Sequence, residues 1–278
     1  MREIEKLKEH ILKEHPRLSK ESRFKFSCHK NVPCFNECCG DVNIFLTPYD
    51  IIRLKRNLGI TSTEFLSKYT ISPFDKNLKY PIILLKMGDD EKKKCPFVSA
   101  EGCTVYADRP WACRMYPLGL ASPGKDSGEH QEEFYFLLKE DACKGFLEDK
   151  NYSVDEWLKD QGIDEYNRMG EYFRDLTTHR FFQEGNPLEP RKMEMFFLAC
   201  YDIDRFRDFV FKSSFFNKFE VDEATRNKIR EDDIELHKFG IKWLRLILFG
   251  EGTIAIKKDV LEAKKKELEQ KNADKNNG

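Results

Sequence analysis

Hydrophobic residues in the second half of the chain repeat at helical spacing. Aromatic and aliphatic residues lie three or four positions apart in "DEYNRMGEYFRDLTTHRFF", "PRKMEMFFLACYDIDRFRDFVF" and "DEATRNKIREDDIELHKFGIKWLRLILF". Ser153 and Glu156 have the spacing of a capping box, which predicts that a helix begins just after Ser153. The pattern predicts an all-helical domain over residues 151–258, followed by a charged tail over residues 259–278 that is either a frayed helix or a flexible segment.

The first half of the chain has shorter and more varied patterns. In "TPYDIIRLKRNLG", Thr47 is a typical N-cap, Pro48 suits the first helical position and Gly59 supplies the end of the helix. Thr61 and Glu64 have capping-box spacing and predict a second helix directly afterwards. Three runs predict short strands: "KYPIILLKM", "KCPFV" and "EEFYFLL".

Composition and charge narrow the class of protein. The 278 residues are 40% hydrophobic and 35% charged, which suits a globular protein. The net charge of −1 gives no overall attraction to nucleic acid or to an acidic membrane. Residues 1–23 predict a charged helical leader without a secretory signal, and the longest apolar run, "WLRLILFG", is too short to cross a bilayer. We therefore expect a cytoplasmic protein with no nucleic-acid or membrane partner.

A protein partner is the remaining interaction that the sequence leaves open. It would bind through the helical domain, where Phe215, Phe216 and Phe219 are candidates for an exposed surface.

Cysteine dominates the chemistry of the first half. Eight of the nine cysteines lie within the first 143 residues: Cys28, Cys34, Cys38, Cys39, Cys95, Cys103, Cys113 and Cys143. In a reducing compartment, clustered cysteines favour metal binding over a disulfide framework, and the adjacent pair Cys38–Cys39 is poorly suited to a disulfide. Cys200 stands apart on a helix with large apolar neighbours, which predicts a buried core thiol.

The eight clustered cysteines offer soft thiolate ligands, which select zinc, copper(I) or iron–sulfur clusters. Eight ligands suit two four-thiolate sites, or one polynuclear cluster with spare thiols. Neighbouring residues on extended backbone point in opposite directions, so Cys38 and Cys39 serve either two metals or opposite sides of one cluster. His29 adjoins Cys28 and is an alternative ligand.

The residues around the candidate ligands also fit a metal centre. Four thiolates leave a negative charge that neighbouring cations offset, and Lys30, Arg109 and Arg114 lie beside candidate ligands. Five aromatic residues suit either an apolar shell around the metal or ordinary core packing: Phe35, Phe97, Tyr106, Trp111 and Tyr116.

This arrangement resembles the YkgJ-type cysteine-cluster family, whose nickname is its CxxCxxCC signature. The resemblance covers about residues 24–147 and rests on the order of the cysteines, "LTPYDIIRLKRNLGI" and the block "CPF…GCTVYADRPWACRMYPL". The first loop differs from the signature, with five residues between Cys28 and Cys34 and three between Cys34 and Cys38. The resemblance implies a zinc- or iron-chelating domain in which all eight cysteines are ligands.

The combined prediction is an α+β, helix-rich protein. A small, irregular, metal-stabilised cysteine-cluster domain over residues 24–150 precedes the helical domain. We expect an iron–sulfur cluster in preference to zinc, with a redox or accessory role, because a structural site needs only four cysteines. Two alternatives are a binding module with structural zinc and a protein methyltransferase that resembles the flagellin lysine methylases. Enzymatic activity, as an oxidoreductase component or methyltransferase, stays open.

Overall fold

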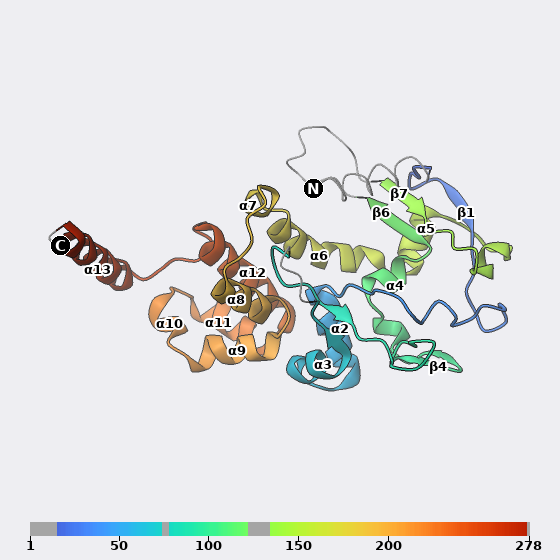
Figure 1. Ribbon diagram of the computed structural model, residues 1–278, viewed down its shortest axis with the longest axis horizontal. Coiled ribbons are helices and arrows are strands. Elements are labelled where there is room, and N and C mark those ends of the chain that lie inside the picture. The colour runs from blue at the N-terminus through green and yellow to red at the C-terminus, as the bar shows by residue number, and fades with distance from the viewer. Residues whose placement is uncertain (1–15, 74–77, 122–133, 277–278) are drawn as a thin grey trace.

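The computed structural model describes residues 16–73, 78–121 and 134–276, and it has the predicted α+β, helix-rich architecture. Figure 1 shows an elongated molecule with the cysteine-bearing segments at one end, the helical bundle in the middle and α13 projecting at the other end. The helices and 3₁₀ turns (η) are α2 (Pro48–Leu58), α3 (Ser62–Tyr69), η1 (Tyr106–Asp108), α4 (Trp111–Met115), η2 (Lys144–Leu147), α5 (Val154–Asp160), α6 (Ile163–Thr177), α7 (Arg180–Gln183), α8 (Pro190–Cys200), α9 (Ile203–Lys212), α10 (Phe215–Lys218), α11 (Glu223–Glu231), α12 (Asp233–Phe249) and α13 (Lys258–Asn276).

The strands in the described residues form four antiparallel pairs. The strands are β1 (Arg23–Lys25), β2 (Thr70–Ile71), β3 (Leu84–Leu85), β4 (Val98–Ser99), β5 (Gly102–Cys103), β6 (Leu118–Ala121), β7 (Phe134–Leu137) and β8 (Asn151–Ser153). They pair as β1–β8, β2–β3, β4–β5 and β6–β7. Each strand has only two to four residues, so backbone pairing alone gives the cysteine-bearing segments little rigidity.

The capping residues read from the sequence begin the helices as predicted. Helix α2 begins after Thr47 and ends at Gly59, which adopts a left-handed conformation with φ of 65°. Capping boxes open α3 at Thr61 and α5 at Ser153, because each N-cap hydroxyl accepts a hydrogen bond from the third helical N–H.

Two of the three predicted strands are much shorter than expected. "KYPIILLKM" contributes only β3, and "KCPFV" contributes only β4, which pairs forward with β5 and not back with β3. The backbone N–H of Cys95 donates instead to the carbonyl of Cys39, at 2.7 Å, so this segment lies against the end of the first cysteine loop. The third prediction is confirmed by β7, although Glu132 and Glu133 lie outside the described residues.

The two chain ends differ in part from the prediction. Residues 1–15 of the predicted helical leader lie outside the described residues, and residues 16–22 contain a turn and an isolated bridge between Leu18 and Tyr135 instead of a helix. Most of the predicted tail is the helix α13.

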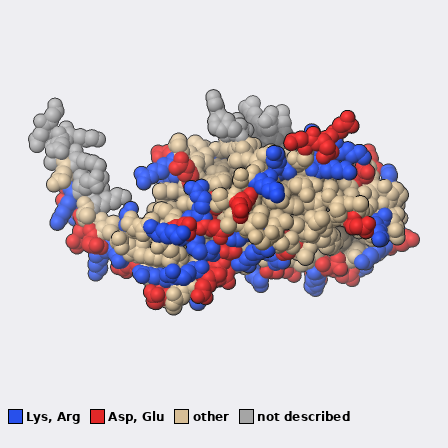
Figure 2. Space-filling model, turned by 90° about the horizontal axis from the view of Figure 1, so that it is seen from below, with Lys and Arg blue, Asp and Glu red and all other residues tan. Residues whose placement is uncertain are grey.

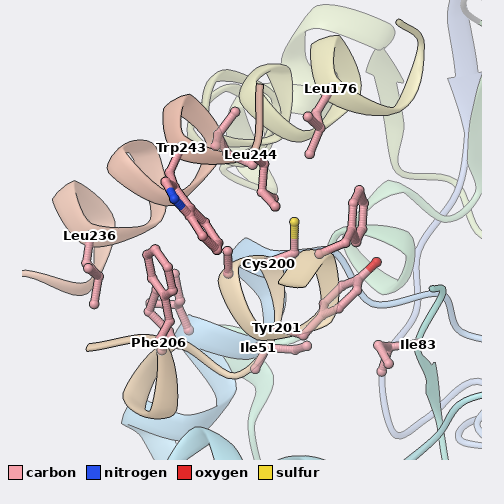
Figure 3. Close-up of a cluster of buried hydrophobic side chains, with 14 of the residues drawn as sticks. Ile51, Ile83, Leu176, Cys200, Tyr201, Phe206, Leu236, Trp243 and Leu244 are labelled. Atoms are coloured by element: carbon pink, nitrogen blue, oxygen red, sulfur yellow. The ribbon is translucent and has the colours of Figure 1, made fainter. Parts of the chain in front are cut away.

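The largest hydrophobic core joins both halves of the chain. Figure 3 shows side chains from α2, α6, α8, α9 and α12 directed into this core, among them Ile51, Leu176, Cys200, Phe206 and Trp243. Cys200 is 2% exposed, which confirms it as a core thiol. A second core joins β1, α4, β6, α5 and the start of α6. Packing is therefore continuous across residue 150.

Two of the three phenylalanines proposed as a partner surface belong to the core. Phe215 is 2% exposed and Phe219 is 8% exposed. Phe215 packs against both Phe219 and Trp243, because α10 folds back onto α9 and α12.

Charged residues of both signs are interspersed on the face shown in Figure 2. No helix in the described part of the chain combines the length and apolar character needed to span a bilayer.

A half-buried ion cluster also holds α2 against the helical bundle. Lys55 Nζ of α2 lies 2.7 Å from Asp204 Oδ1 of α9 and 3.4 Å from Asp233 Oδ2 at the start of α12. Arg207 Nη2 lies 2.5 Å from Asp233 Oδ1, and Arg56 Nε lies 3.1 Å from Asp233 Oδ2. Asp233 thus offsets three cations from two helices.

We expect Asp233→Ala to lower the free energy of unfolding by about 1–3 kcal/mol, because Lys55 and Arg207 keep Asp204 but lose their second carboxylate in a partly buried site. Urea denaturation measures this change. The matched control is Asp208→Ala, which removes an exposed pair with Lys212 and should cost less than about 1 kcal/mol. Equal losses in the two variants would contradict the importance of the cluster.

His237 on α12 is 1% exposed, and neither ring nitrogen has a hydrogen-bond partner among the described residues. Burial, assisted by Lys238, lowers the pKa of His237 from 6.5 to about 4. The folded protein therefore holds this ring neutral, while the unfolded chain takes up a proton below pH 6.5.

Wild-type stability should consequently fall, relative to His237→Leu, as the pH drops from 6.5 toward 4, by about 3 kcal/mol at most. Urea denaturation of both proteins across this pH range measures the difference, because most other groups titrate alike in both. Parallel stability curves would show that His237 does not titrate on unfolding.

Candidate metal centre

The eight clustered cysteines come from five places in the fold. Cys28, Cys34, Cys38 and Cys39 lie in the loop before α2. Cys95 precedes β4, Cys103 ends β5, Cys113 lies in α4 and Cys143 directly precedes η2. All of them are free thiols. Cys28, Cys38 and Cys113 are exposed, and the other five are half-buried.

The first cysteine loop is folded by its own turns. Val32 N donates to the His29 carbonyl at 2.9 Å, Glu37 N to the Cys34 carbonyl at 3.0 Å and Cys39 N to the Asn36 carbonyl at 3.1 Å. These short-range bonds form irregular backbone, as the sequence predicted.

The segment around Cys143 packs against the start of this loop. The Lys144 N–H donates to the Cys34 sulfur at 3.1 Å, and Ser27 N donates to the Gly145 carbonyl at 3.0 Å. A Cβ at Gly145 would lie 2.7 Å from the Ser27 carbonyl oxygen, so the close approach requires glycine. Burial, together with the neighbouring thiols, raises the pKa of Cys28 to about 11.

The end of the loop is attached to the second group of cysteines. Gly40 forms an isolated bridge with Lys94, beside the bond between Cys95 N and the Cys39 carbonyl. In the β4–β5 hairpin, Val98 pairs with Cys103. Cys95 and Cys103 are packed against the main hydrophobic core.

A buried carboxylate positions the helix that carries Cys113. Asp50 is 0% exposed, and its Oδ1 accepts a hydrogen bond of 2.8 Å from Trp111 N at the start of α4. Burial raises the pKa of Asp50 to about 6, although its hydrogen bonds to Thr47 and Trp111 oppose the rise.

Cys113 itself combines exposed surface with a desolvated sulfur. Burial raises the pKa of its thiol to about 12, with Cys95, Asp50 and Cys103 adding negative charge nearby.

The adjacent cysteines interact directly. The Cys39 thiol lowers the pKa of Cys38 to about 7, and the same interaction raises the pKa of Cys39. Cys38 is therefore the thiol of this pair that loses its proton first, which is the step that turns a cysteine into a metal ligand.

Two buried arginines lie beside the cysteines without a carboxylate partner among the described residues. Arg109 and Arg114 are each 8% exposed. Arg109 donates to the Tyr106 carbonyl at 2.7 Å and to Gln161, and it lies in electrostatic range of Cys113 and Cys103. Arg114 donates to the carbonyls of Arg109, Gln161 and Ala107. Of the two arginines, Arg109 is therefore the better candidate for the cation that offsets the charge of the thiolates.

The other neighbours of the cysteines have more ordinary contacts. Lys30 is exposed and lies 3.9 Å from Glu101, and His29 Nε2 lies 3.1 Å from Glu148. Phe97 is buried in the main core, whereas Tyr106 is 60% exposed beneath the Arg109 guanidinium. These residues show core and surface packing in place of a common apolar shell.

Trp111, Tyr116 and Phe35 also have packing roles. Trp111 and Tyr116 lie against the second core, and the ring of Phe35 lies 3.3 Å from where a Cβ on Gly102 would be.

Backbone contacts join several of the segments that carry the cysteines, but the described thiols do not form a complete ligand set. In the ranges that the structure describes, no group of three or more Cys, His, Asp or Glu side chains is placed to hold a metal ion. The chemistry of the donors nevertheless fits a thiophilic metal, since all eight cysteines are free thiols and three of them lie in electrostatic range of the buried cation Arg109. Zinc or iron would be held by thiolates from this set.

The sequence pattern indicated that Asp50 lies in the first turn of a helix, but it did not indicate that Asp50 positions the helix that carries Cys113. Its partner Trp111 lies 61 residues away, and no local pattern reports such a contact.

Comparison with known proteins gives one match. Residues 27–144 match the model of the CxxCxxCC family, described as "Putative zinc- or iron-chelating domain". No curated protein and no solved structure matches the chain. The matched region contains all eight clustered cysteines, so this part of the chain is similar to the family that the sequence resembled.

Proposed function

We propose that this chain is a cytosolic metal–thiolate protein whose eight N-terminal cysteines hold iron–sulfur centres with a redox or accessory role. The observation that carries the proposal is Arg109, a buried cation without a carboxylate partner in the described structure, which lies in electrostatic range of the thiols of Cys28, Cys103 and Cys113. A buried guanidinium is costly unless an anion lies nearby. A four-thiolate centre with its net negative charge supplies that anion.

The exposed cysteines support a redox role. Cys28, Cys38 and Cys113 reach the surface, so electrons would travel only a short distance between a bound centre and a partner. The number of thiols supports the same role, because one structural zinc needs only four ligands.

Structural zinc is the second candidate, and the short strands favour it. Two to four residues per strand cannot by themselves hold the cysteine-bearing loops, so bound metal would supply much of their stability. The same eight cysteines would be the ligands.

Metal analysis and absorbance spectroscopy on anaerobically purified protein test the proposal. We expect brown protein with iron, acid-labile sulfide and a broad visible absorbance. Colourless protein with zinc would replace the iron–sulfur proposal with structural zinc. Protein that carries neither metal would overturn both.

Arg109→Gln should weaken metal retention by about 10- to 100-fold, because it removes the buried positive charge beside Cys103 and Cys113. Competition with a chelator measures the change. The control is Arg180→Gln, which affects an exposed arginine paired with Glu184 and should leave metal retention unchanged. Equal retention in wild type and Arg109→Gln would show that Arg109 does not stabilise the centre.

A further inference from the structure

We infer that the eight cysteines form two separate metal sites, an outer and an inner one, that differ in how firmly the fold supports them. This inference rests on the proposed function, namely that the cysteines bind metal. The outer site consists of Cys28, Cys34, Cys38 and Cys143, and the inner site of Cys39, Cys95, Cys103 and Cys113.

The outer group is brought together by the contact between the first loop and the start of η2. The Cys28 thiol lies within electrostatic range of Cys38, Cys34 and Cys143. Hydrogen bonds fix the same arrangement, since Lys144 N donates to the Cys34 sulfur and Ser27 N donates to the Gly145 carbonyl. The residues that flank Cys28 and Cys143 are therefore held side by side.

The inner group is brought together by backbone contacts and by the proximity of its thiols. Cys95 N donates to the Cys39 carbonyl, and the β4–β5 hairpin folds Cys103 back toward Cys95. The Cys113 thiol lies within electrostatic range of Cys95 and Cys103, and the Cys39 thiol within range of Cys95 and Cys113.

Cys38 and Cys39 form the boundary between the two sites. They lie in a turn and their thiols interact with each other, while Cys38 also lies in electrostatic range of Cys28, and Cys39 in range of Cys95 and Cys113. Arg109 lies in electrostatic range of Cys28 as well as of Cys103 and Cys113, and its charge is therefore shared by both sites.

The fold supports the two sites unequally. Three outer cysteines come from one loop that is folded mainly by its own turns, and two of them are exposed. Among the inner cysteines, Cys95 and Cys103 pack on the main core and Cys113 lies in α4, which Asp50 fixes to α2. Cys39 ends the first loop and is held by its backbone bond to Cys95. Local opening is easiest where few buried contacts hold the backbone. The outer site is thus the labile one, and the inner site holds the fold.

Differential alkylation of the full-length metal-bound protein tests this division. The as-purified protein is treated with EDTA, samples are labelled with iodoacetamide over time, and fragment mass spectra report each cysteine while the released metal is measured. We expect Cys28, Cys34, Cys38 and Cys143 to become labelled together as about half of the metal leaves. The four inner cysteines should follow in a slower phase with the rest.

Labelling of all eight cysteines in one phase, or in groups of other membership, would overturn the division while leaving metal binding intact. Complete labelling before EDTA is added, in protein without metal, would instead overturn the proposed function. The two failures are therefore distinguishable.

Paired substitutions give a second test. The outer double variant, Cys28→Ser with Cys143→Ser, should keep about half of the metal and release all of it in the slow phase. The inner double variant, Cys95→Ser with Cys103→Ser, should release its remaining metal in the fast phase. The inner variant should also have the lower melting temperature of the two. Cys200→Ala, in the core, is the matched control and should keep the full metal content. Loss of all metal from the outer variant would show that the eight thiols share one cluster. Should the inner variant fail to fold, the outer variant and the labelling of wild type still decide the question.

Discussion

The burial of helix α2 is the constraint on which the rest of the structure depends. Its apolar face, with Ile51 and Leu54 fully buried, packs into the main core beside α8, α9 and α12. Its charged residues Lys55 and Arg56 meet Asp204 and Asp233 of the bundle. At its N-terminus, Asp50 reaches the start of α4. One helix of eleven residues thus connects the helical half to the segment that carries Cys113.

Arg53 extends this role of α2 toward the cysteine segments. Its Nε donates to Asp108 Oδ1 at 2.6 Å, and Asn57 donates to Asp108 Oδ2 at 2.8 Å, so the turn η1 is fixed to α2. Arg109 follows directly after η1. Arg109, the buried cation beside Cys103 and Cys113, is therefore positioned by the bonds that its neighbour Asp108 makes to α2. Because α2 packs in the main core, the charge balance of the cysteine region depends on that core.

The two arginines illustrate how similar residues in one motif acquire different roles. Arg109 and Arg114 are five residues apart and equally buried. Arg114 uses its guanidinium to join the carbonyls of Ala107, Arg109 and Gln161, and it also lies 4.6 Å from the centre of the Tyr166 ring. It fixes the turn before α4 to the junction of α5 and α6, which leaves Arg109 as the cation facing the thiols. The block around Cys113 thus serves packing as well as metal chemistry.

The sequence by itself determined the helical caps at Thr47, Thr61 and Ser153, the burial of Cys200 and the soft-ligand chemistry of the other eight cysteines, because each depends on neighbouring residues or on side-chain type. It overestimated two strands because apolar runs do not report which backbone groups find partners. Only the tertiary structure decided that Cys95 is bonded to the backbone of Cys39, that Lys144, next to Cys143, donates to the Cys34 sulfur, and that Asp50 supports α4. These contacts join residues 56 to 110 positions apart, and they exist only because burial of the shared core brings the distant segments together.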